Sequence, residues 1–340
     1  PAPETSEWYW PYALRPVIRW WPTILGAGFF WLVAAWWLAP EKTNRRRTIF
    51  GLTGLFIASL LLQLAIIYAD RPDPSAELID RTLSNLASGF FEPAADIEDL
   101  REVLRTYPQQ MPQFASEHAQ THPPGLIIAN WLTIQLLAKW PAFSEVIAEV
   151  VRPLRCTDLW LINRSPGVAA ALAFWSLLPS FAAALAVIPA YSLAKQILQG
   201  RARRLAAALV ASIPALLLFT PKSVQLYALL TLILFWTFQS ALDRQSSWRF
   251  VITGMILSLM TYLSLGNAAL FVLLVIYAIS LTWLGDKEKL VRRKSGIWID
   301  LLKQLLLFAI GAASIWLLTW AAWGASPWAI AEVGLQQHYN

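Results

Sequence analysis

The stretch HAQTHPPG at 118–125 leads directly into the apolar run LIIANWLTIQLLAKW at 126–140. Whether that run crosses a membrane decides the side on which every later segment lies. The paired prolines favour a helix that begins just after them, because proline fits the first turn of a helix. The chain has three histidines, and two of them stand in this stretch.

The composition is that of a membrane protein. Hydrophobic residues make up 57% of the 340 residues and charged residues 14%, with a mean hydropathy of +0.49. Soluble domains carry about 25% charged residues. The apolar residues also come in blocks of about 18–25, the length that spans a bilayer as a helix. The sequence therefore predicts an all-α polytopic membrane protein.

The charge pattern predicts how the spans are oriented. The net charge of +6 is concentrated in short basic clusters between apolar blocks, at 41–47, 195–204 and 286–294. Such clusters mark cytoplasmic loops, so we expect no nucleic-acid partner. Placing all clusters on one side gives about eight transmembrane helices. They are expected at 20–38, 48–69, 168–194, 205–219, 224–242, 250–265, 268–284 and 301–323.

This arrangement holds only if 126–140 does not cross. A crossing there would force 143–167 to cross back, and that stretch is charged. Its charged residues are Glu145, Glu149, Arg152, Arg155, Asp158 and Arg164. Each would cost roughly 2.5–3.5 kcal/mol at the bilayer centre. We therefore expect the run to lie at the outer interface, or to dip in and return, with Lys139 accessible from outside.

Three regions follow from this topology. An interfacial segment and two spans occupy 1–69, an extracytoplasmic loop with juxtamembrane helices occupies 70–167, and a six-helix region that ends in an outer loop occupies 168–340. The outer loop holds two helix-like pieces, SAELIDRTLSNLASGFF and DIEDLREVLRTY. Both have apolar residues at helical spacing but are too charged to enter lipid.

Two carboxylates at the start of this loop are candidates for acid–base chemistry. Asp70 and Asp73 directly follow a span. A partly desolvated carboxylate is a suitable general base, because burial raises its pKa. The plain alternative is a pair of solvated residues in a Pro-rich turn. Because both ends of the loop are fixed at one face, we expect these carboxylates and the histidines to meet in a single cleft.

His118, His122 and Lys222 are candidates for contact with an anion. The two histidines have the i,i+4 spacing of some zinc sites, but only Glu117 lies beside them and no third ligand follows from spacing. A divalent metal is thus possible but unsupported, and no metal site is predicted. A hydrogen bond to a phosphate or hydroxyl, or a role in holding the turn, is favoured. Lys222, in a short outer turn, suits either an anionic headgroup or an interfacial anchor.

Several of these segments resemble the integral-membrane glycosyltransferases of the GT-C superfamily, in the branch of protein O-mannosyltransferases and aminoarabinose transferases. YADRPDPSAELIDRTLSNLASGFFEPA at 68–94 resembles their acidic motif and first juxtamembrane helix. THPPGLIIANWLTIQLL at 121–137 resembles the H/K-P-P motif that introduces the second. The likeness covers 48–285.

The resemblance implies transfer of a sugar from a polyprenyl-phosphate carrier to an acceptor on the extracytoplasmic face of the cell (plasma) membrane. Asp70 or Asp73 would deprotonate the acceptor. The groups that would bind the donor phosphate are Arg71, His118, His122 and Lys222. The helix after HPPG would form part of a groove for the lipid tail, so the lipid-linked sugar and the bilayer are the implied partners.

The chain also departs from that branch. Its members often carry an Asp-Glu pair, whereas Asp70 and Asp73 are separated by Arg-Pro, so either can match. They also continue with further spans, so a fragment or a non-catalytic member is expected here. The alternatives are a scaffold subunit packed against other membrane subunits, and a lipid or solute transporter. The scarcity of charged residues within the spans speaks against the transporter.

Overall fold

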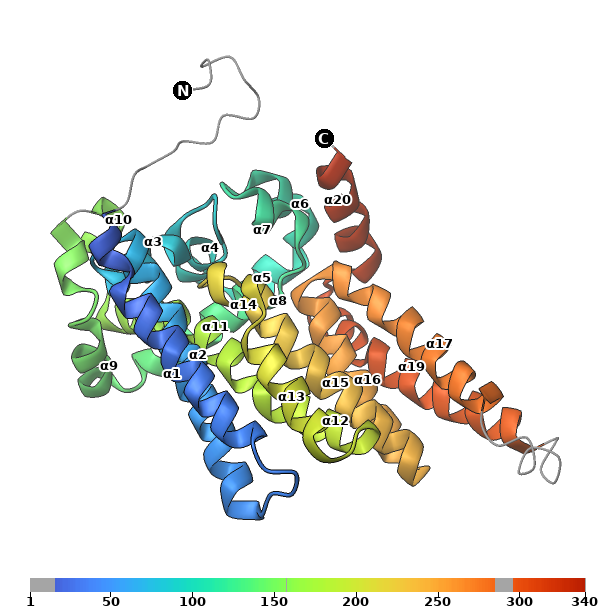
Figure 1. The fold of residues 1–340 in the computed structure, drawn as a ribbon. Coiled ribbons are helices and arrows are strands. Elements are labelled where there is room, and N and C mark those ends of the chain that lie inside the picture. Colours follow the sequence, from blue (N-terminus) through green and yellow to red (C-terminus); the bar gives the residue numbers. More distant parts are fainter. Residues whose placement is uncertain (1–15, 157, 285–295, 340) are drawn as a thin grey trace, which may run out of the picture.

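The computed structural model describes residues 16–156, 158–284 and 296–339, and every regular element in this part of the chain is helical (Figure 1). Six helices are long and apolar enough to cross a membrane, or seven if one sharply bent pair counts as a span. The predicted all-α polytopic architecture is therefore confirmed at this level. The predicted interfacial segment up to residue 15 and the basic cluster at 286–294 lie outside the described residues.

Most of the predicted spans coincide with these helices. The candidate spans are Val17–Leu38, Arg45–Asp70, Pro166–Ile197, Val224–Arg244, Leu265–Trp283 and Trp298–Trp323. They contain the helices α1 (Trp21–Leu38), α2 (Arg45–Asp70), α11 (Pro166–Leu185), α12 (Val187–Ile197), α15 (Val224–Arg244), α17 (Ala269–Leu284) and α19 (Gly296–Trp323). Six of the eight expected spans match in position.

The other two expected spans differ in form. The segment at 205–219 is broken into α13 (Gly200–Ala211) and α14 (Pro214–Leu218). Pro214 has no amide hydrogen to continue the helix, which explains the break. Helix α16 (Ser247–Leu263) has 17 residues, about 26 Å at 1.5 Å per residue, which is short of the roughly 30 Å hydrocarbon core.

The run after HPPG is not a straight span. It forms α8 (Gly125–Ala138) and α9 (Pro141–Ala148), whose axes differ by 113°. Helix α8 has 14 residues, about 21 Å, too short to cross alone. Its side rests on α11, where the Trp175 indole N–H donates to the Thr133 hydroxyl at 3.1 Å. This geometry agrees with a segment that bends instead of crossing straight.

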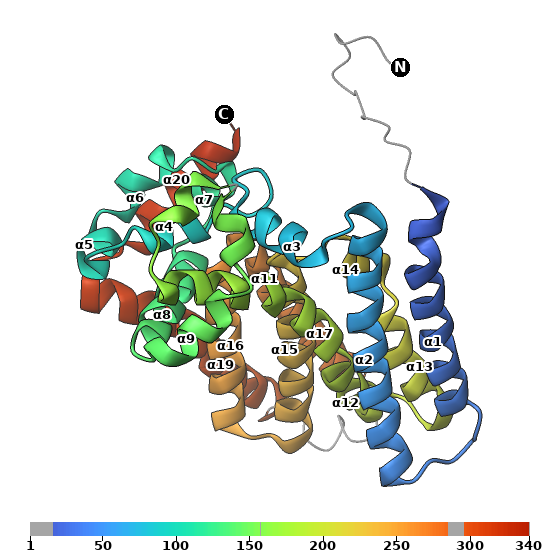
Figure 2. The ribbon, with the colours of Figure 1, turned by 90° about the vertical axis from the view of Figure 1, so that its left-hand side faces the viewer.

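The helices of the large loop gather at one end of the bundle. They are α3 (Pro74–Leu83), α4 (Phe91–Ala95), α5 (Leu100–Arg105), α6 (Tyr107–Gln110) and α7 (Glu117–Thr121). Figure 2 shows most of them beside α20 (Pro327–Tyr339), at the end where α2 finishes. We call this the loop end. The connections α1–α2, α12–α13 and α15–α16 lie at the opposite end (Figure 1), as the basic clusters predict for the first two.

A buried apolar cluster joins the loop helices to the membrane helices. Leu104, Tyr107 and Met111 of the loop pack with Leu126 of α8 and Ile330 of α20. All five side chains are buried. At about 1.5–3 kcal/mol for each fully buried large side chain, this cluster is enough to fix the loop helices on the bundle.

Candidate functional site

The turn at 219–223, between α14 and α15, lies over a buried polar network. Gln225 of α15 donates from its amide nitrogen to the Gln63 amide oxygen at 3.0 Å and to the Leu216 carbonyl at 2.7 Å. The Thr220 hydroxyl donates to the same Gln63 oxygen at 3.0 Å. Gln63, Thr220 and Gln225 are all buried. Because a buried polar group must be paired, this network fixes the turn on α2.

Arg81 of α3 ties the same turn to the end of α2 from the other side. Its Nη1 donates to the Thr220 carbonyl at 2.7 Å, and its Nε pairs with the Glu77 carboxylate at 2.7 Å. The third nitrogen, Nη2, lies 3.4 Å from Oδ2 of Asp70. The Asp70 and Arg81 side chains are 40% and 28% exposed. One planar guanidinium therefore connects Asp70, α3 and the turn, as a rigid fork of donors allows.

Asp73 serves as the N-terminal cap of α3. Its Oδ1 accepts hydrogen bonds from the backbone amides of Ser75 and Ala76, each at 3.1 Å, and from the Ser75 hydroxyl at 2.6 Å. The Ser75 hydroxyl, followed by the Ala76 amide, lowers the pKa of Asp73 below its ordinary value. A capping carboxylate with a lowered pKa is a weak base. Of the two aspartates, Asp70 is therefore the better candidate for a general base.

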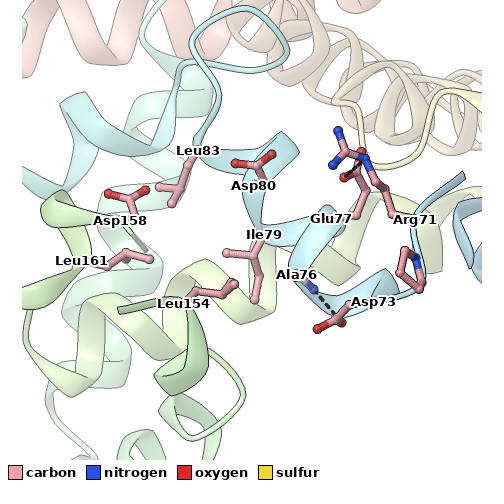
Figure 3. A pocket seen from close by; sticks show the side chains of 11 residues that line it. Arg71, Asp73, Ala76, Glu77, Ile79, Asp80, Leu83, Leu154, Asp158 and Leu161 are labelled. Atoms are coloured by element: carbon pink, nitrogen blue, oxygen red, sulfur yellow. Dashed lines mark hydrogen bonds and ion pairs between the residues drawn. The ribbon is translucent and has the colours of Figure 1, made fainter. Parts of the chain in front are cut away.

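A cavity of about 290 Å³ lies beside α3, and we call it the α3 cavity. Figure 3 shows Arg71 and Glu77 together at one side of it, with Asp73 turned toward Ala76 and away from them. Arg71 and Glu77 form an ion pair with 3.5 Å between nitrogen and oxygen, and Arg71 is 61% exposed. Asp80 and Asp158 also line the cavity. With four carboxylates and one cation, the lining of this cavity is negatively charged, which disfavours the binding of a phosphate.

His118 belongs to α7, and His122 is the residue that directly follows this helix. Their ring centroids are 6.2 Å apart. The ring of Phe90 lies edge-on at 5.5 Å from His122, and the Tyr107 hydroxyl donates to the His122 carbonyl at 3.0 Å. Nδ1 of His122 lies 3.1 Å from the Thr121 hydroxyl. These contacts fix the backbone and the ring of His122 before α8 begins.

His118 lies within electrostatic reach of Lys222. Burial and then the nearby ammonium lower the pKa of His118 below its ordinary value of 6.5, against smaller opposing effects from Glu117 and from a hydrogen bond to the backbone of Leu86. At neutral pH the imidazole is therefore uncharged. Lys222 is the cation that lowers this pKa. Its backbone amide donates to the side-chain oxygen of Gln225 at 3.3 Å, so the polar network holds its backbone in place.

A larger cavity, of about 900 Å³, is lined by both histidines, and we call it the α7 cavity. Its walls come from α7, from the turn around η4 (Leu265–Ala268) and from α20. The α3 cavity and the α7 cavity share no lining residue. Asp73 and Arg71 thus belong to one cavity, and His118 and His122 to the other. Asp73 and the two histidines therefore do not share the single cleft that was expected, and Asp70 lines neither cavity.

The glycine of HPPG has a packing role. A Cβ at Gly125 would lie 2.2 Å from the carbonyl oxygen of Tyr262, at the end of α16. Pro123 and Pro124 are buried beside it. Only glycine allows the start of α8 to approach the α16 backbone this closely. The motif therefore docks α8 on α16 and, in doing so, positions the two histidines.

Part of this site was missed by the sequence reasoning. Gln63 is the only amide side chain in the span at 48–69, which has no charged residue, and its isolation was a signal for a buried hydrogen-bond partner. Arg81 gave no comparable signal, because its three partners are brought together only by the fold. Within the described residues, no group of three or more His, Cys, Asp or Glu side chains is placed to hold a metal ion.

No protein-family model, curated protein or solved structure matches this chain.

Proposed function

We propose that this protein is a membrane glycosyltransferase that moves a sugar from a polyprenyl-phosphate donor to an acceptor hydroxyl on the extracytoplasmic face. One observation carries the proposal. Arg81 links the carboxylate of Asp70 to the Thr220 carbonyl, in the turn that also bears Lys222. Arg81 thus connects the candidate base, Asp70, to the turn that carries the candidate phosphate ligand, Lys222. The sequence resemblance over 48–285 supports the same activity.

Asp70 is the proposed general base. Its carboxylate takes the proton of the acceptor hydroxyl while the acceptor oxygen attacks the anomeric carbon. The bond from that carbon to the phosphate oxygen breaks, and the polyprenyl phosphate leaves with the electron pair. Attack opposite the leaving group inverts the anomeric configuration. Arg81 holds the Asp70 carboxylate in a fixed orientation before the substrate binds, which lowers the entropic part of the barrier.

Lys222 is the proposed ligand of the departing phosphate, since negative charge develops there in the transition state. His118, whose pKa is lowered by burial and by Lys222, contributes hydrogen bonding in its neutral form. Two other candidates have weaker support. Arg71 is already paired with Glu77, and the ring of His122 is held by Thr121 and Phe90.

The bend between α8 and α9 is the proposed contact with the lipid tail and the bilayer. Exposed large apolar side chains here are Leu136 of α8, Phe143 and Val146 of α9, and Trp140 between the two helices. A contiguous apolar surface of this kind marks an interaction with lipid or with another protein. Its place on the helices that follow HPPG suits a prenyl chain whose phosphate reaches Lys222.

A transfer assay in lipid nanodiscs tests the proposal. The donor is a polyprenyl phosphate that carries a radiolabelled sugar, and the readout is the release of the label from the lipid. We expect turnover by the unaltered protein and a reduction of about 10–100-fold in Lys222→Gln, because one charge-stabilising donor is lost. Lys139→Gln, at the exposed bend after α8, is the matched control and should keep normal turnover.

Two results would overturn the proposal. Absence of both donor binding and turnover in the unaltered protein would favour the non-catalytic subunit instead. Equal losses in Lys222→Gln and Lys139→Gln would show that Lys222 has no particular place in the reaction.

A further inference from the structure

The α7 cavity is large, and its lining is mostly uncharged. Glu117 is the only charged side chain among the described residues that line it, since none of them is Lys or Arg. Its volume of about 900 Å³ lies at the upper end of the range of small-ligand sites, roughly 300–1,000 Å³. Because no Lys or Arg among the described residues lines it, this cavity does not suit the lipid phosphate. We therefore expect a different class of ligand there.

The polar groups around it are those that bind hydroxyls. Gln120 and Gln337 contribute amides, and Thr121 and Ser264 contribute hydroxyls. The Gln120 amide already donates to the Phe114 carbonyl at 2.7 Å, and the Thr121 hydroxyl donates to the Glu117 carbonyl at 2.9 Å. Gln120 keeps a second N–H and its oxygen, and Thr121 keeps its oxygen as an acceptor, for the hydroxyls of a sugar. Phosphates and carboxylates are bound chiefly by Lys and Arg instead.

The histidines fit the same chemistry. The pKa of His118 is lowered by burial and by Lys222, so the ring is neutral at pH 7 and can donate from one nitrogen and accept at the other. Because His118 lines the cavity and also lies within reach of Lys222, it stands at the border between the cavity and the proposed phosphate site.

We propose that the α7 cavity binds a neutral, hydroxyl-rich ligand of more than one sugar unit. In the reaction proposed above, this ligand is the acceptor, and its reactive end leaves the cavity past His118 and Lys222. The acceptor role rests on the proposed function, whereas the binding itself does not. The fold supports a separate saccharide site, because α20 and the η4 turn line the α7 cavity but contribute no residue to the α3 cavity.

Gly266 offers a way to block the cavity without disturbing the fold. A Cβ at Gly266 would meet only the Ser264 hydroxyl, at 3.8 Å, which is ordinary van der Waals contact. The residue is exposed and lines the cavity. Gly266→Trp would therefore fill part of the cavity, and Gly266→Ala is a matched control that changes the backbone in the same way but adds one methyl group.

The experiment measures binding by saturation-transfer NMR to the full chain in nanodiscs. The probes are maltotriose, cellotriose and mannotriose, with inorganic phosphate as the anionic comparison. We expect at least one trisaccharide to bind, with at least tenfold weaker binding to Gly266→Trp and a change of less than about twofold in Gly266→Ala. Failure of all three trisaccharides to bind, equal binding by both variants, or displacement of the trisaccharide by phosphate would overturn the inference.

A second readout separates this inference from the proposed function. Binding of a polyprenyl phosphate, measured by native mass spectrometry, should be the same in Gly266→Trp and in the unaltered protein. Trisaccharide binding without any sugar transfer would leave the saccharide site standing and remove the glycosyltransferase. Undiminished transfer in Gly266→Trp would remove the acceptor role of the cavity and leave the glycosyltransferase standing.

Discussion

The α3 cavity and the α7 cavity are lined in large part by the same loop, 70–122, yet their chemistry is opposite. The α3 cavity has four carboxylates and one Arg, whereas the α7 cavity has one Glu, two His and a set of amides and hydroxyls. The turn at 219–223 lines neither cavity and is bound to α3 through Arg81. Charge and neutral polarity are thus separated within a single loop.

The charged groups beside α3 are largely engaged with the protein itself. Asp73 caps α3, and Asp158 caps α10 (Leu159–Ile162) through the Trp160 amide at 2.8 Å. Glu77 pairs with both Arg71 and Arg81. The comparison teaches that a cluster of charge at a candidate site can be structural, so charge alone does not mark a ligand site.

The largest expected effect separates the two aspartates. Asp70→Asn removes the proposed base but keeps the shape of the side chain, so the rate of sugar transfer should fall by about 10²–10⁴-fold. The amide can still accept a hydrogen bond from Arg81, so we expect the thermal unfolding midpoint to change little. The transfer assay in nanodiscs measures the first quantity, and a fluorescence melt in detergent measures the second.

Asp73→Asn is the matched control, because asparagine caps a helix about as well as aspartate. Transfer by this variant should remain within about twofold of normal, since the role of Asp73 in capping is retained. Loss of activity in Asp73→Asn with full activity in Asp70→Asn would reverse the assignment of the base. Full activity in the double variant would exclude carboxylate catalysis by this loop.

The sequence predicted the helical class and the position of six spans, because hydropathy acts locally along the chain. That the run after HPPG does not cross the membrane stays a prediction. It could not predict how the loop folds back. Arg81 meets Thr220 across 139 positions, and Gln225 meets Gln63 across 162, so neither pair follows from spacing. Spacing likewise gave no sign that Asp73 and the two histidines line different cavities, whereas a single cleft was expected.

The next effect tests the docking of α8. Gly125→Ala would place a methyl group where the Tyr262 carbonyl stands, so the helices must separate at a cost of about 1–3 kcal/mol. We expect a lower unfolding midpoint and weaker trisaccharide binding in the α7 cavity. Gly28→Ala is the control, because a Cβ there meets nothing within 4 Å. Equal midpoints for the two variants would contradict the packing role of Gly125.

A substitution in the polar network should lower the unfolding midpoint by a similar or smaller amount than Gly125→Ala. Gln225→Leu leaves the Leu216 carbonyl without its side-chain donor and removes the acceptor of the Lys222 amide. An unpaired buried polar group costs about 1–3 kcal/mol. The variant should unfold at a lower temperature and bind polyprenyl phosphate less tightly, because Lys222 is no longer held. Gln135→Leu, on an exposed side of α8, should show neither change; a match between the two variants would mean that the network does not fix the turn.

The smallest effect is on pH dependence. His118 has a lowered pKa in the folded protein, so the unfolded chain takes up a proton at higher pH than the folded one. The stability that this residue contributes is present above about pH 6.5 and is lost as the pH falls toward the folded pKa. In His118→Gln the fall of the unfolding midpoint between pH 7.5 and pH 5 should be shallower. Parallel curves for the two proteins would contradict this.

The central claim is that the lipid phosphate binds between Lys222 and His118, and not in the charged cavity beside α3. An electron cryo-microscopy map of the protein in nanodiscs that contain a polyprenyl phosphate tests it most directly. The account predicts phosphate density at Lys222 and His118, with prenyl density running toward α8. Phosphate density at Arg71, in the α3 cavity, would contradict it.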